Sequence, residues 1–137
     1  MTLHLLPISS FETAADKDVT PFIHQNMQVI PYFNGDMTVP LYNFDGLLGT
    51  RTGGYSSTND GYLQLYRSGI LEVVDASSIY YEQNKELVIP SNMIEFALIR
   101  SLKQYINFYR QIEISPPIFL VMSLLNIKGA IFASPKT

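Results

Sequence analysis

The chain has 137 residues, of which 15% are charged, well below the roughly 25% of an average soluble domain. Nine basic against twelve acidic residues give a net charge of −3, which disfavours a stand-alone nucleic-acid-binding protein. The absence of cysteine excludes disulfide frameworks, thiolate zinc sites and cysteine nucleophiles. The length is sufficient for one hydrophobic core.

The first residues carry the weakest pattern. Residues 1–20 are interpreted as an arm or linker, and residues 21–137 as a single α+β domain. The N-terminus lacks the basic residues that precede the apolar part of a secretory signal, so we expect a cytoplasmic location. Glu12, Asp16 and Asp18 lack the glycine-centred loop of a calcium site and indicate an ordinary solvated segment.

A glycine-rich segment follows between Gly46 and Gly61, with five of the eight glycines and several Ser, Thr, Asn and Asp residues between them. This composition predicts a surface loop. A phosphate-binding loop would need a Lys-Ser/Thr pair at its end and a helix directly after it, and this segment has neither.

The clearest strand pair is Tyr62–Tyr66 with Ile70–Val74, joined through Ser68-Gly69 in a tight hairpin. Alternation places two tyrosines and a glutamine of the first strand on one face and two leucines on the other.

A long amphipathic helix is predicted after Pro90. Asn92 is placed to cap it, and Glu95, three residues on, completes a capping box. The helix ends between Gln111 and Ile114, because Pro116-Pro117 forbids continuation. Apolar residues recur every three or four positions and predict one face packed on a sheet: Ile94, Leu98, Leu102, Tyr105, Tyr109 and Ile112.

The most apolar stretch, Ile118–Leu125, is predicted to be an interior strand. Asn126 and Lys128 interrupt it before the ~20 residues that a membrane-spanning helix needs, so we expect no membrane association. A turn near Lys128-Gly129 then returns a short strand at Ala130–Phe132. The expected fold class is α+β, a mixed β-sheet with hairpins packed against one long amphipathic helix.

Residues that could perform catalysis are scarce. The two histidines, His4 and His24, have no GxSxG nucleophile to activate, and no HExxH motif provides a zinc site. We predict no cofactor, metal or catalytic residues. A small hydrolase or nuclease stays as an alternative, and it requires Glu72, Asp75 or His24 to converge in one pocket.

Five residues form the candidate contact site for a ligand or partner: Arg51, Tyr55, Tyr62, Tyr66 and Arg67. Nucleic-acid bases stack on tyrosine and guanidinium groups meet phosphates, so a nucleic-acid-binding module is one reading of this set. The other reading is that the face packs against the helix or another domain.

Three stretches resemble a known family: Asn43–Leu48, Tyr62–Asp75 and Pro117–Phe119. They are similar to the C-terminal region of bacterial proteins with an AlbA-like, Schlafen-type DNA-binding domain, some described as ATP-binding. The resemblance runs in order from Thr38 to Phe132. In that family, nucleic-acid or nucleotide binding belongs to an N-terminal domain that residues 1–40 do not resemble.

The resemblance therefore implies an accessory region without catalytic residues. The expected function is a non-catalytic interaction or sensing domain. Its partner is a neighbouring domain or protein, and nucleic acid is reached through that partner.

Overall fold

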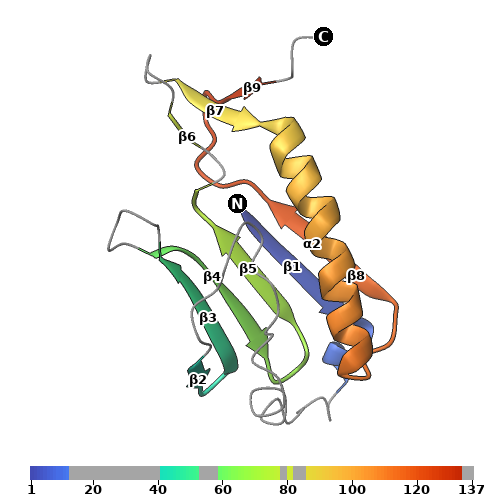
Figure 1. Ribbon diagram of the computed structural model, residues 1–137. Helices are drawn as coiled ribbons and strands as arrows, with labels where there is room; N and C mark the ends of the chain where they lie inside the picture. The colour runs from blue at the N-terminus through green and yellow to red at the C-terminus, as the bar shows by residue number, and fades with distance from the viewer. Residues whose placement is uncertain (13–40, 53–58, 78–79, 82–85, 134–137) are drawn as a thin grey trace.

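The computed structural model describes residues 1–12, 41–52, 59–77, 80–81 and 86–133. These residues form a six-stranded sheet, a long helix along one of its faces and a small three-stranded sheet (Figure 1). The predicted α+β class is confirmed. The large sheet is antiparallel throughout, and a parallel pair is found in the small sheet.

Six strands build the large sheet: β1 (Thr2–Pro7), β2 (Leu41–Asn43), β3 (Gly46–Thr52), β4 (Asn59–Tyr66), β5 (Leu71–Asp75) and β8 (Ile118–Ser123). Their order is β2-β3-β4-β5-β1-β8. Strands β2 to β5 follow one another as hairpins, whereas β1 and β8 come from the two far parts of the chain. The sheet is therefore complete only when segments that are far apart in the sequence pair with one another.

Strand β1 lies inside the sheet, between β5 and β8, with Leu3 and Leu5 fully buried. The interpretation of residues 1–20 as an arm or linker is therefore wrong for residues 2–7, and residues 13–20 lie outside the described part. Alternation over only six residues is too short to establish a strand by itself, and the burial of this segment depends on pairing with strands far away in sequence. The short 3₁₀ helix η1 (Ile8–Phe11) follows β1.

Strand β3 occupies the first half of the segment that composition predicts as a loop. Leu47 is buried opposite Leu65, so pairing and core packing override the freedom of the glycines. Gly46 ends the β2–β3 turn at a φ of +147°, and its N–H donates to Asn43 Oδ1 at 2.8 Å. A Cβ there would lie 2.1 Å from the carbonyl oxygen of Leu65, which explains the glycine. Residues 53–58 lie outside the described part.

The β4–β5 hairpin is confirmed, with Leu63 opposite Val73 and Leu65 opposite Leu71. All four side chains are buried in the core under α2, so the tyrosine face of β4 does not pack against the helix, contrary to one of the two readings of that face. Gly69 takes a φ of +87° at the turn, a conformation that favours glycine.

Helix α2 (Ser91–Gln111) ends where the Pro116-Pro117 pair predicts, but its start differs from the expected capping box. Pro90 occupies the cap position and no side chain caps the helix; the Ser91 hydroxyl donates instead to the carbonyl of Ala133 at 2.9 Å. The buried face follows the predicted side of the helix: Ile94, Ala97, Ser101, Tyr105 and Tyr109. Leu98 and Leu102, also predicted to face the sheet, are partly buried at its margin.

Strand β8 is found where the apolar run predicts a strand, but it is the last strand of the sheet rather than an interior one. Its four central residues, Phe119–Met122, are all exposed. Apolar composition by itself does not distinguish a strand with two neighbours from one with a single neighbour. The prediction of an interior strand is therefore wrong.

The small sheet combines β6 (Tyr80–Tyr81), β7 (Leu87–Pro90) and β9 (Ile131–Ala133) in the order β6-β7-β9. It lies at the N-terminal end of α2, beyond the large sheet (Figure 1). The predicted strand at Ala130–Phe132 corresponds to β9, and Gly129 before it has a φ of +80°. Among the described residues, no helix combines the length and apolar character needed to cross a membrane.

Candidate functional site

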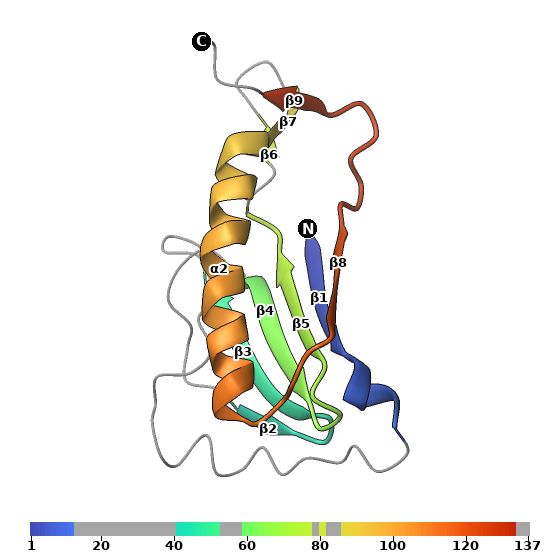
Figure 2. The same cartoon turned by 90° about the vertical axis from the view of Figure 1, so that its right-hand side faces the viewer.

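Helix α2 packs on one face of the large sheet, and the other face, here called the distal face, carries the candidate site (Figure 2). The register of the strands decides which side chains lie there. Leu3 faces α2, so its neighbours His4 and Thr2 point to the distal face, together with their cross-strand partners Glu72 and Val74. Tyr62, opposite Val74, joins them from β4.

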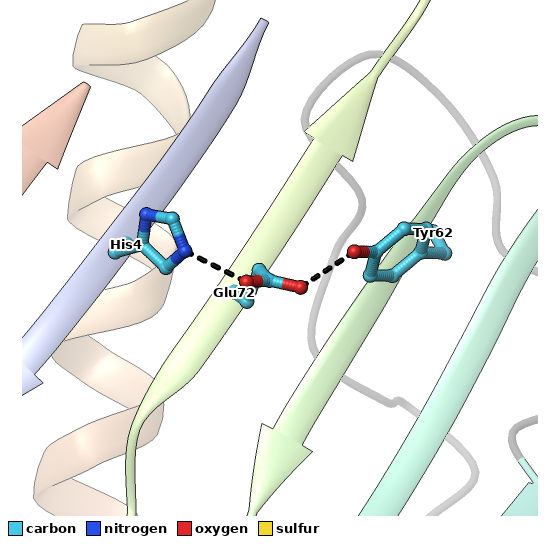
Figure 3. Close-up of polar contacts among 3 residues, drawn as sticks. All are labelled: His4, Tyr62 and Glu72. Atoms are coloured by element: carbon cyan, nitrogen blue, oxygen red, sulfur yellow. Dashed lines mark hydrogen bonds and ion pairs between the residues drawn. The ribbon is translucent and has the colours of Figure 1, made fainter. Parts of the chain in front are cut away.

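Three of these side chains form one hydrogen-bonded cluster, drawn in Figure 3. His4 Nε2 lies 2.7 Å from Glu72 Oε2, and the Tyr62 hydroxyl donates to Glu72 Oε1 at 2.6 Å. Because a carboxylate only accepts hydrogen bonds, His4 must carry a hydrogen on Nε2. The cluster therefore joins β1, β5 and β4 across the sheet through a single carboxylate.

The cluster is partly accessible to solvent. The side chains of His4 and Glu72 are 31% and 18% exposed, so the carboxylate is shielded but can still be reached from outside. Sequence reasoning does not find this cluster, because His4 belongs to a segment interpreted as an arm. The period-2 alternation of residues 2–7 is the signal that could have found it.

Glu72 helps to raise the pKa of two neighbouring tyrosines. The hydrogen bond to Glu72, assisted by burial and by the carboxylate charge, raises the pKa of Tyr62 to about 12. Burial, followed by the charges of Glu72 and Asp45, also raises the pKa of Tyr66. Both phenols therefore stay protonated at neutral pH and act as hydrogen-bond donors with apolar rings, not as nucleophiles or bases.

A shallow hollow of about 420 Å³ lies beside the cluster on the distal face. The described residues of its lining are mostly small or apolar, and none of them is charged: Leu48, Thr50, Gly61, Tyr62, Val74 and Ala76. Tyr62 belongs both to the hollow and to the cluster. The arrangement can hold an apolar group in the hollow while its polar neighbours contact Glu72.

The predicted contact residues are only partly brought together. Tyr62 and Tyr66 are half-buried residues of β4, and Arg67 is exposed at the turn that follows, where its Nε donates to the carbonyl of Phe44 at 3.1 Å. Arg51 belongs to β3, opposite Gly61, and its side chain is outside the described part. Tyr55 also lies outside it.

The acids required for a hydrolase or nuclease point in different directions. Glu72 lies on the distal face, whereas Asp75 is buried and its Oδ1 accepts hydrogen bonds of 2.7 Å from the N–H and the hydroxyl of Ser77. His24 lies outside the described residues. Within the described ranges, no group of three or more His, Asp or Glu side chains could hold a metal ion.

No family model matches this sequence, and no curated protein or solved structure matches it either.

Proposed function

We propose that this chain is a non-catalytic accessory domain that binds a neighbouring protein or domain through its distal face. The observation that carries the proposal is the joining of the Glu72 cluster to an uncharged hollow through Tyr62. The centres of protein interfaces are depleted in charge and enriched in tyrosine, whose ring is apolar and whose hydroxyl bonds. The distal face has this composition.

Pre-organisation supports binding at this face. Both oxygens of Glu72 are already held by His4 and Tyr62, so the carboxylate loses little freedom when a partner contacts it. Each oxygen has lone pairs for a further donor. The complementary partner offers a hydrogen-bond donor to Glu72 and an apolar side chain to the hollow.

The family resemblance supports the same role. In the proteins that the sequence resembles, with an AlbA-like, Schlafen-type DNA-binding domain, nucleic-acid or nucleotide binding belongs to an N-terminal domain, and we assign the accessory part to this chain. In this proposal nucleic acid is bound by the partner, and the present chain contributes the protein contact. Its low charge and pI of about 5.2 agree with that division.

Calorimetric titration of the chain with the polypeptides encoded by its neighbouring genes tests the proposal. We expect binding that Glu72→Ala and Val74→Lys each weaken at least about tenfold, since one removes the acceptor and the other fills the hollow with a charge. Phe96 lies on the outer side of α2 and is 70% exposed, so Phe96→Lys is the matched control and should bind normally. A folded chain that binds none of these polypeptides, or that binds unchanged after both substitutions, contradicts the proposal.

The nucleic-acid alternative is separated by a mobility-shift assay at low salt. It requires a complex that weakens with added salt and with Arg67→Ala. The carboxylate of Glu72 next to Tyr62 counts against it, because it repels the phosphates of a strand stacked on that ring.

A further inference from the structure

The outer edge of β8 has the properties of a pairing edge. Inside the sheet it pairs with β1, and no described strand pairs with its other side. Monomeric proteins protect such edges with charges, prolines, bulges or very short strands. The opposite edge strand, β2, has only three residues, but β8 has six, none of them charged or proline.

The direction of the backbone groups of β8 follows from one bond at its start. Ile8 N–H donates to the carbonyl of Pro117 at 3.0 Å, so these two residues occupy a hydrogen-bonded position of the ladder, at which Pro117, having no N–H, only accepts. Bonded and non-bonded pairs alternate along antiparallel strands. The N–H and C=O groups of Ile118, Leu120 and Met122 therefore point away from β1.

The side chains of β8 are apolar on both faces of the sheet. Phe119 is 54% exposed and the next three residues, Leu120 to Met122, are 43–44% exposed. On the α2 side the apolar surface continues across a groove of about 310 Å³. The groove is lined by Ile118 and Leu120 and by Leu102 and Ile106 of the helix, and among its described lining residues only Arg110 is charged.

We propose that β8 pairs antiparallel with β8 of a second copy of this chain, with the two-fold axis passing at Leu120. In this register the outward backbone N–H and C=O groups of Leu120 lie opposite those of the partner's Leu120. Those of Ile118 lie opposite those of the partner's Met122. Each such pair exchanges two N–H···O=C bonds. It also places Phe119 opposite the partner's Val121 on the distal face, an aromatic and β-branched pair of the type that stabilises sheets.

A second copy fits this edge better than a partner of other chemistry. The edge has no charge, so two identical strands meet without repulsion between like groups. The exposed apolar residues of β8 continue into the exposed Ile99 and Ile106 of α2, so pairing of two copies buries apolar surface of the helix as well as the strand edge. A two-fold axis perpendicular to the sheet keeps both helices on the same side, so the two grooves face each other.

Sedimentation equilibrium of the full chain by itself tests the pairing. We expect a mass about twice the 15.5 kDa of one chain at micromolar concentration. Leu120→Lys places two ammonium groups at the axis and should raise the dimer dissociation constant at least about tenfold, whereas Phe96→Lys, which adds the same charge elsewhere, should not. Circular dichroism establishes that each variant is folded.

A charge exchange tests the register. Phe119→Lys and Val121→Glu should each weaken the dimer, and the double variant should restore it, because each introduced ammonium then faces an introduced carboxylate of the other copy. The restored dimer should weaken with salt, unlike the unsubstituted one. Any of three results overturns the proposal. The unsubstituted chain stays at 15.5 kDa up to hundreds of micromolar, the folded Leu120→Lys variant remains fully dimeric, or the double variant dimerises no more tightly than the single variants. Because no other polypeptide is present, these outcomes are independent of partner binding by the distal face.

Discussion

Replacing Tyr109 by Phe tests how α2 is fastened to the sheet. The Tyr109 side chain is buried, and its hydroxyl lies 2.9 Å from the carbonyl oxygen of Gly69 and 3.2 Å from that of Leu5. These contacts connect the end of α2 to the β4–β5 turn and to β1. Tyr109→Phe removes the hydroxyl and keeps the ring, so the packing of the helix against the sheet is retained.

The expected loss in the free energy of unfolding depends on the carbonyl acceptors that lose their hydroxyl donor. Leu5 also pairs with Leu71 in the sheet, but the turn residue Gly69 is buried and its carbonyl accepts a hydrogen bond from Tyr109. A buried acceptor that loses its donor costs about 1–3 kcal/mol. For a domain of this size we expect Tyr109→Phe to lower the free energy of unfolding by about 1–2 kcal/mol and the Tm by roughly 3–8 °C.

Tyr105 provides the matched control one turn earlier. Its ring is equally buried, but among the described residues its hydroxyl makes no hydrogen bond to the sheet, and its polar neighbour is Ser101 of the same helix. Tyr105→Phe should therefore change the free energy of unfolding by less than about 0.5 kcal/mol or raise it. Urea unfolding followed by far-UV circular dichroism measures both variants. If Tyr109→Phe costs no more than Tyr105→Phe, the fastening role of its hydroxyl is refuted.

Burial raises the pKa of Tyr105 and Tyr109 above the ordinary value. Their contribution to the free energy of unfolding is therefore complete below pH 10 and is lost as the pH rises above it. Parallel absorbance and circular-dichroism titrations should show that the two tyrosines ionise as the chain unfolds. Glu72→Gln should lower the pKa of Tyr62 from about 12 towards 10, measured as the difference between its absorbance titration and that of the same variant carrying Tyr62→Phe; an unchanged pKa contradicts the role of the carboxylate. Gly46→Ala should cost at least about 2 kcal/mol in urea unfolding, since its Cβ would overlap the Leu65 carbonyl, whereas Gly129→Ala, in open space, should cost about 1 kcal/mol; equal costs would refute the steric account.

The elements predicted correctly are those whose signal is local. The β4–β5 hairpin follows from alternation and a turn glycine, and α2 follows from its apolar periodicity and the prolines after it. The errors at β1, β3 and β8 share a physical cause. Each of these strands depends on neighbours for its burial, and composition does not say which neighbours those are.

The sequence by itself determined the α+β class, the long helix, the central hairpin and the small number of charges, because periodicity, turn residues and composition act over short distances. Only the tertiary structure decided that residues 2–7 enter the sheet and carry His4 to Glu72, 68 residues away. It also decided that the most apolar strand lies at an edge. Strand order is fixed by pairing between distant segments, and both the distal-face cluster and the proposed dimer edge follow from that order.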